Sequence, residues 1–189
     1  TLYGPFCKLT GLGQSHQQIE CAIPPGQGLQ VPIQVNVSDQ ISNIAYFNYD
    51  KPYIQSITPL NAPTQGGTPI TIRGINFGTG VNNALYLGPA LLQSDSIVFW
   101  NHTYIIFTSP RGTGANILTT MNVAGQWSQY QATKLFSYQV PTITQVTGCP
   151  VNIGPMTTEC PITGGTRVTL VGTNFGNDTS VISVSVGFT

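Results

Sequence analysis

The amino-acid sequence predicts an all-β protein built from β-sandwich units in tandem. Short runs of apolar and β-branched residues are separated by turn residues, with 21 Gly and 14 Pro among 189 residues. No stretch keeps the apolar period of a helix over a useful length, so we expect strands throughout. Motifs also recur along the chain, and such recurrence is typical of a repeated structural unit.

The clearest repeat is a strand followed by a turn. Residues 66–78 read Gly-Gly-Thr-Pro-Ile-Thr-Ile-Arg-Gly-Ile-Asn-Phe-Gly, and residues 164–176 keep the same Gly, Asn and Phe positions. Glycine and asparagine tolerate a positive φ in the Gly-x-Asn-Phe-Gly turn, and its Phe is expected to anchor the loop in a core. The turn lacks the Lys-Ser/Thr of a phosphate-binding loop and precedes no helix, so we interpret it as structural.

Two further patterns define the domain organisation. Residues 19–28 match residues 105–114, and residues 47–52 match residues 136–141. Their order predicts one complete unit and two partial ones, so that the chain is two repeat periods cut inside a unit. The C-terminal half of a unit is expected at residues 1–52, a complete unit at residues 53–141, and the N-terminal half of a third at residues 142–189.

These segments resemble the IPT/TIG family, immunoglobulin-like domains that occur in plexins, Met-type receptors, some transcription factors and glucan-acting enzymes. The ordered set of motifs covers nearly the whole chain: Ile57-Thr58-Pro59, Gly66-Gly67, the turn at residues 74–78, Ser109-Pro110-x-Gly112 and Phe136-x-Tyr138. The resemblance implies immunoglobulin-like β-sandwiches of the IPT/TIG type in tandem.

The four cysteines fall in two close pairs: Cys7, Cys21, Cys149 and Cys160. We expect disulfides in preference to reduced core cysteines. A metal site is the least favoured, because no Cys-x-x-Cys spacing occurs and the chain has only two histidines. The family's extracellular members often carry a cysteine pair in the middle of the domain, which Cys7 and Cys21 match. The complete unit departs from this pattern, and the resemblance implies an apolar contact between Leu91 and Phe107 instead.

Three sequons predict covalent N-linked glycans at Asn36, Asn101 and Asn177. Alternating apolar residues over 29–37 place Asn36 on the solvent face of a strand. Disulfides and glycans together indicate an extracellular or cell-surface location. Glycans would also supply the solubility that a chain with only 6% charged residues lacks. Because the sequence has no initiator Met and no signal peptide, we expect a mature or excised segment.

Composition and motifs argue against several functions. The net charge is zero and the six cations are scattered, which excludes a nucleic-acid partner held through phosphates. No apolar run reaches the roughly 20 residues of a membrane span in this segment. No catalytic, metal-binding or cofactor motif occurs, so we expect neither an enzyme nor a cofactor. His16 and His102 are expected in solvated loops, and Trp100 and Trp127 in packing rather than in sugar stacking.

The partial units carry the functional hypothesis. A half sandwich leaves its apolar inner face exposed to water. The final run of the chain presents an unpaired apolar edge, which we expect to be an assembly strand: Ile182, Val184, Val186 and Phe188. The closing half of a neighbouring copy, or of a neighbouring repeat in one longer polypeptide, would complete the opening half head to tail. The leading hypothesis is an extracellular glycosylated structural protein that forms a fibril from copies of itself. The alternatives are the stalk of a plexin- or Met-like receptor or adhesion protein, and an accessory module of a glucan-acting enzyme.

Overall fold

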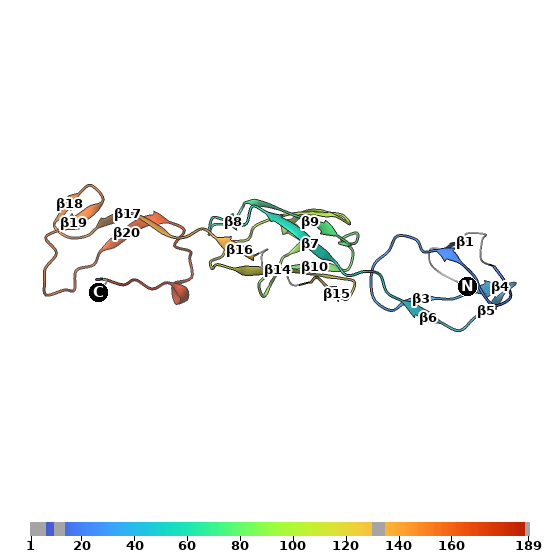
Figure 1. The fold of residues 1–189 in the computed structure, drawn as a ribbon. Helices are drawn as coiled ribbons and strands as arrows, with labels where there is room; N and C mark the ends of the chain where they lie inside the picture. Colours follow the sequence, from blue (N-terminus) through green and yellow to red (C-terminus); the bar gives the residue numbers. More distant parts are fainter. Residues whose placement is uncertain (1–6, 10–13, 130–134, 188–189) are drawn as a thin grey trace.

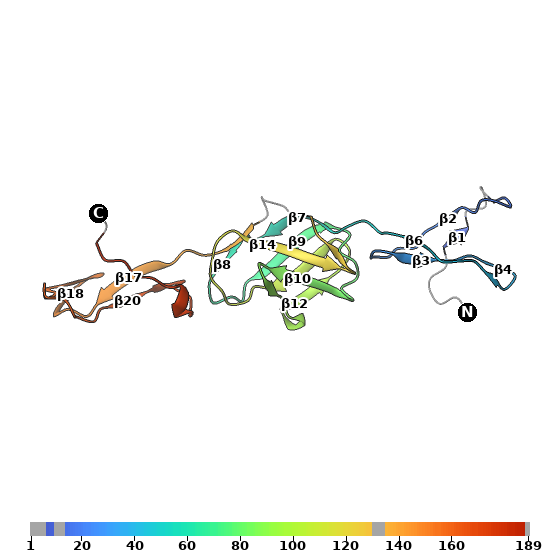
Figure 2. The same cartoon turned by 90° about the horizontal axis from the view of Figure 1, so that it is seen from below.

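Three groups of strands follow one another along the chain. Figures 1 and 2 show them in a row, with the first and last groups on opposite sides of the middle one. The structure is a computed structural model and describes residues 7–9, 14–129 and 135–187. Within these residues every regular element is a strand, except for 3-10 turns at Ser94–Ser96 and Thr179–Val181. The prediction of an all-β protein is confirmed.

The middle group, here called the central sandwich (residues 52–138), consists of two sheets. The four-stranded antiparallel sheet has the order β12 (Ile97–Trp100), β13 (Tyr104–Thr108), β9 (Pro69–Ile75) and β7 (Tyr53–Thr58). The facing sheet has the order β11 (Ala90–Leu91), β10 (Asn83–Leu87), β14 (Ile117–Val123), β16 (Leu135–Tyr138) and β8 (Asn61–Ala62), with β15 (Gln126–Trp127) beside β14. Strand β8 runs parallel to β16, whereas the other pairs are antiparallel.

The core of the central sandwich forms because alternate residues of each strand point between the sheets. In the first sheet, Ile72 of β9 lies opposite Ile105 of β13, and both are fully buried. In the second sheet, Leu85 of β10 lies opposite the buried Met121 of β14. Phe77, from the Gly-x-Asn-Phe-Gly turn, is fully buried among them, as expected.

The first group is here called the leading segment (residues 7–49). Its described residues form three short strand pairs, and among them no second sheet covers these pairs. The pairs are β1 (Lys8–Leu9) with β2 (Cys21–Ala22), β3 (Val31–Ile33) with β6 (Ala45–Phe47), and β4 (Asn36–Val37) with β5 (Gln40–Ile41). A disulfide joins Cys7 to Cys21, with a Cα–Cα distance of 5.6 Å.

The last group, here called the trailing segment (residues 142–187), contains two strand pairs: β17 (Thr142–Thr147) with β20 (Thr169–Thr173), and β18 (Val151–Ile153) with β19 (Met156–Thr158). A second disulfide joins Cys149 to Cys160, with a Cα–Cα distance of 5.0 Å. Each disulfide joins two cysteines of the same segment, so neither ties one segment to another.

One expectation differs from the structure. Phe107 is buried as expected, but Leu91 is exposed and the adjacent Leu92 enters the core. A one-residue error in strand register reverses which side chains face inward, which explains the difference. The assembly strand stays a prediction: Ile182, Val184 and Val186 belong to no strand of the described chain, and Phe188 lies outside the described residues.

Candidate assembly faces and domain joints

The leading segment has the local structure of the second half of the central sandwich. Its hairpin β4–β5 has the same strand pairing as β14–β15. The same serine hydrogen bond follows each hairpin: Ser42 Oγ accepts from the Val35 amide at 3.0 Å, and Ser128 Oγ accepts from the Met121 amide at 3.1 Å. The tyrosine at the end of the leading segment also makes the same hydrogen bond as the tyrosine at the end of the central sandwich. Tyr49 donates to the Pro24 carbonyl at 2.7 Å, and Tyr138 donates to the Pro110 carbonyl at 2.9 Å.

The trailing segment has the local structure of the first half. Strands β17 and β20 pair with a register shift between Ile143 and Gln145, and β7 and β9 pair with a shift between Ile54 and Ser56. In each pair a glycine of the second strand leaves no room for a Cβ. At Gly74 that atom would meet the Tyr53 carbonyl and the Phe77 ring, and at Gly172 the Thr142 carbonyl and the Phe175 ring.

The apolar faces of both segments are exposed where their counterparts in the central sandwich are buried. Val37 of β4 is 60% exposed, whereas Val123 at the matching position of β14 is 1% exposed. Ile143 of β17 is 56% exposed against 1% for Ile54, and Val168 beside β20 is 44% exposed against 0% for Ile70. Each segment therefore presents one inner face of a sandwich without the sheet that would cover it.

The glycine pair of the trailing segment lacks the contact that its counterpart makes. In the central sandwich, the Gly67 amide donates to the Ser109 carbonyl at 2.9 Å, and a Cβ on Gly66 would lie 2.6 Å from the Pro110 carbonyl carbon. Gly164 has nearly the same φ as Gly66, +73° against +76°, but a Cβ there would meet nothing within 4 Å. The trailing backbone already has the shape that fits a proline turn, and none of the described residues places such a turn against it.

Two joints link the three parts of the chain. The first connects the leading segment to the central sandwich, and the second connects the central sandwich to the trailing segment. A Gly-x-Asn-Phe-Gly turn binds the linker at each joint. Asn76 and Asn174 adopt positive φ, +62° and +59°, and each donates from Nδ2 to the linker ahead of its own domain. Asn76 donates to the Lys51 carbonyl at 3.1 Å, and Asn174 to the Val140 carbonyl at 3.3 Å. These joint contacts were missed in the sequence, where the turn carries only the signal of a positive-φ asparagine.

The first joint is closed by a glutamine side chain. Gln27, from the leading segment, accepts from the Thr79 amide at 3.1 Å and donates to the Val81 carbonyl at 3.0 Å. It lies so close to Gly78 that a Cβ there would overlap it. Gln126 adds a donor to the Tyr49 carbonyl at 2.7 Å.

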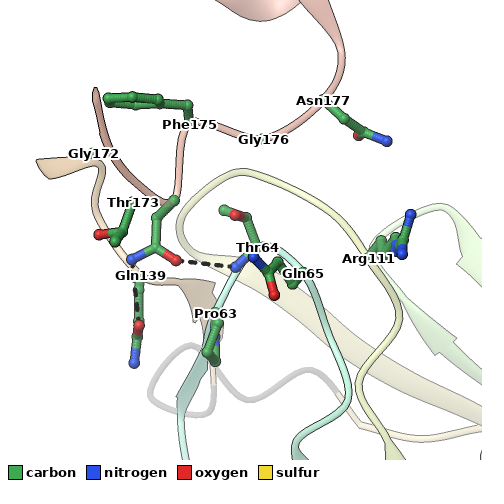
Figure 3. Close-up of a pocket in the computed structure, with 11 residues that line it drawn as sticks. Pro63, Thr64, Gln65, Arg111, Gln139, Gly172, Thr173, Phe175, Gly176 and Asn177 are labelled. Atoms are coloured by element: carbon green, nitrogen blue, oxygen red, sulfur yellow. Dashed lines mark hydrogen bonds between the residues drawn. The ribbon is translucent and has the colours of Figure 1, made fainter. Parts of the chain in front are cut away.

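The second joint keeps an open cleft of about 780 Å³. Thr113 approaches Gly176 at the position where Gln27 approaches Gly78, and its side chain is too short to reach across. Figure 3 shows Gln139 and Thr173 on one side of this cleft and Arg111 and Asn177 on the other. Asn174 bridges to the central sandwich by accepting from the Thr64 amide at 3.3 Å.

The structure spreads the other predicted residues over the surface rather than gathering them. The asparagines of the three sequons are exposed on different parts of the chain: Asn36 in β4, Asn101 after β12 and Asn177 beside the second joint. His16 and His102 are exposed in loops, as expected. Trp100 packs on the core and donates from Nε1 to the Phe77 carbonyl, but the expectation of packing is wrong for Trp127, which is exposed beside Tyr86.

Among residues 7–9, 14–129 and 135–187, no three His, Cys, Asp or Glu side chains gather closely enough to hold a metal ion. No helix of the described chain is long and apolar enough to cross a membrane.

One domain family matches most of the chain. The model of the IPT/TIG domain matches residues 52–138 and 149–189. Plexin-B3 from Homo sapiens is 32% identical over 80 residues, which is 41% of this chain and 4% of that protein. The chain therefore spans a small part of this relative.

Solved structures with similar strands include a surface glycan-binding protein from Prevotella bryantii and the extracellular region of plexin A4. The first shares 17% identity, covers 58% of this chain and 26% of that one, and has a TM-score of 0.45. The second shares 21% identity, covers 68% of this chain and 11% of that one, and has a TM-score of 0.43.

Proposed function

The chain belongs to the IPT/TIG domain family, and from this membership we propose that it is a non-catalytic segment of an extracellular rod of IPT/TIG domains. The rod is the stalk of a cell-surface protein of the plexin kind. The observation that carries the proposal is the repeated joint, in which Asn76 and Asn174 each hold the preceding linker by its carbonyl. An asparagine contact that recurs from joint to joint sets successive sandwiches in line, and a spacer requires such an arrangement.

Three further observations support this function. A stretch of 80 residues is 32% identical to plexin-B3, a larger protein of which the chain spans 4%. The two disulfides are typical of proteins that fold in an oxidising compartment. Exposed sequon asparagines at Asn36, Asn101 and Asn177 are accessible for N-linked glycans.

A second candidate function is a fibril in which IPT/TIG units repeat head to tail without a membrane anchor. The exposed apolar faces of the leading and trailing segments favour it, because a face of this kind is stabilised by a covering sheet. Both candidates place the chain in an extracellular row of domains, and they differ in what the row is attached to.

The native polypeptide distinguishes the two. For the stalk, surface biotinylation of intact source cells should label a polypeptide much larger than the 20.2 kDa of this chain, and detergent should be needed to release it. Removal of N-linked glycans should lower its mass on a denaturing gel. Filaments that sediment without detergent and look beaded under the electron microscope would rule out the stalk and support the fibril. A reduced, unglycosylated protein inside the cell would overturn both.

A further inference from the structure

We propose that the trailing segment of one copy and the leading segment of a second copy fold together into one composite IPT/TIG sandwich, in the register that the central sandwich shows. The inference rests on the proposed row of IPT/TIG domains and names the partner that covers its open faces. The partner is residues 7–49 of another copy of this sequence, on a separate chain or in the next period of a longer polypeptide.

The first sheet of the composite follows from the free edge of β20. In the central sandwich, β9 pairs with β7 on one edge and with β13 on the other, whereas within the described residues β20 pairs with β17 alone. Strand β2 has β1 as its one partner among the same residues, and this pair corresponds to β13 with β12 on its outer edge. Joining β2 to β20 therefore rebuilds the sheet order of the central sandwich.

The repeat specifies the register of this pair. Ile105 lies opposite Ile72 in the central sandwich, and the matching residues are Ile19 and Leu170. Ile19 is exposed in this chain, and Ile105 at its matching position is fully buried. Pairing in this register moves Ile19 from water into a core, and burial of apolar area is the main driving force of association.

The second sheet explains why the final run has no strand. Strand β10 pairs with β14 so that Leu85 lies opposite Met121, and the matching position of Met121 in the leading segment is Val35. The alternating run with Val184 at its centre takes the place of β10, with Val184 opposite Val35. Both valines are exposed in this chain, where the run lacks a strand to pair with.

The glycine pair supplies the closing contact. Residues Ile23 and Pro24 match Ser109 and Pro110, so Gly165 donates to the Ile23 carbonyl and Pro24 covers Gly164 in the composite. Both parts are already shaped for this contact. The Pro24 carbonyl accepts from Tyr49 as in a complete domain, and Gly164 and Gly165 have the positive φ of Gly66 and Gly67.

The leading and trailing segments of one chain do not cover each other in this structure. Figures 1 and 2 show them on opposite sides of the central sandwich, and the two joints hold each to its own end. In the proposed composite, the contact between them is made between copies. A contact of one surface with a different surface on the next copy propagates along a row.

Matched glycine variants test the composite in the full 189-residue chain, secreted with its disulfides formed. Asn tolerates a positive φ, so Gly164→Asn fits the open space around Gly164 but collides with Pro24 in the composite. Gly165→Asn is the control, because a Cβ on Gly67 meets nothing within 4 Å even in the complete sandwich. By sedimentation velocity, the wild type and Gly165→Asn should form rows that lengthen with concentration, and Gly164→Asn should remain at the mass of one chain.

A cysteine pair tests the register independently. Tyr104 lies opposite Arg73, so Gln18→Cys should form an intermolecular disulfide with Val171→Cys. Opposed residues on neighbouring strands have Cβ atoms about 4.5–5.5 Å apart, close to the span of a disulfide. Gln18→Cys with Thr169→Cys is displaced by two residues and should crosslink several-fold less on a non-reducing gel.

Two results would overturn the composite: a wild type that stays monomeric at high concentration, or Gly164→Asn that assembles like Gly165→Asn. Equal crosslinking of the two cysteine pairs would overturn the register. None of these results bears on surface labelling, glycosylation or detergent release, so the proposed stalk fails or stands by separate measurements.

Discussion

At the scale of single residues, one tyrosine hydroxyl closes the proline turn of the sandwich. Tyr138 packs edge-on against the buried Phe136 ring and donates to the Pro110 carbonyl at 2.9 Å. A Cβ on Gly112 would lie 2.6 Å from the same hydroxyl, so the glycine makes room for it. Burial raises the pKa of Tyr138 above its ordinary value of 10.0, because the phenolate is poorly solvated there.

Tyr138→Phe should lower the free energy of unfolding of the central sandwich by about 1 kcal/mol, since it removes this hydrogen bond and leaves the ring. The pH dependence follows from the raised pKa. Folding favours the neutral phenol, so its contribution is complete below the ordinary pKa of 10.0 and declines as the pH rises above it. Urea unfolding at pH 8 and pH 11 should show a loss of stability that is smaller in Tyr138→Phe.

The control for this measurement is Tyr46→Phe, which removes a phenol from an exposed side chain. It should leave both the stability at pH 8 and the alkaline loss unchanged. A loss that is equal in Tyr138→Phe and the wild type would assign the alkaline effect to another group.

At the scale of elements, the Gly-x-Asn-Phe-Gly turn performs two tasks at once. Its Phe enters the core of the domain, and its Asn holds the linker that enters the same domain. The positive φ of Asn76 turns the side chain back toward Lys51, a geometry that most other residues would adopt only with strain.

Asn76→Gly should loosen the first joint while leaving the fold intact, because glycine accepts the same φ and only the amide is lost. We expect a wider distribution of angles between the leading segment and the central sandwich by small-angle X-ray scattering. Asn82→Gly is the control, since Asn82 also has a positive φ and is exposed. Equal broadening in both variants would show that the hydrogen bond from Asn76 to the Lys51 carbonyl does not hold the joint.

Gln27→Ala should also act on the first joint. The substitution leaves the Thr79 amide without the glutamine oxygen, so hydrogen exchange at Thr79 should become faster. Exchange in the core strands β9 and β13 should stay slow. Gln34→Ala removes a glutamine that donates to the Ser42 carbonyl of its own hairpin, so it should leave exchange at the Thr79 amide unchanged.

At the scale of the whole molecule, disulfides stabilise the two outer segments, and a buried core stabilises the central sandwich. The disulfides lie in the leading and trailing segments, and the central sandwich has no cysteine. The central sandwich is held by its own buried core, and the open segments by a disulfide each.

Reduction should therefore act on the ends of the molecule and spare its middle. The Cys7–Cys21 bond closes a loop of about 15 residues, which corresponds to roughly 3 kcal/mol in the chain-entropy model. Limited proteolysis after reduction should cut within residues 7–49 and 142–187 many-fold faster, with the core of residues 53–138 retained. Equal acceleration in the central sandwich would show that its stability depends on the ends.

The sequence by itself determined the all-β class and the IPT/TIG family. Both depend on local information: alternation marks strands, and glycine, asparagine and proline at set positions mark turns. Gly66, Phe77 and Tyr138 were recognisable as motif residues because their backbone or packing role requires their residue type. The burial of Phe77 followed from the same local pattern.

Only the tertiary structure decided which side chains are covered and by what. It buried Leu92 instead of Leu91, packed Trp100 but exposed Trp127, and left Val184 without a strand partner. It also revealed the joints, in which Gln27 reaches a loop more than fifty residues away. The physical reason is that burial and pairing depend on elements distant in sequence, whereas alternation and turn chemistry depend on neighbours.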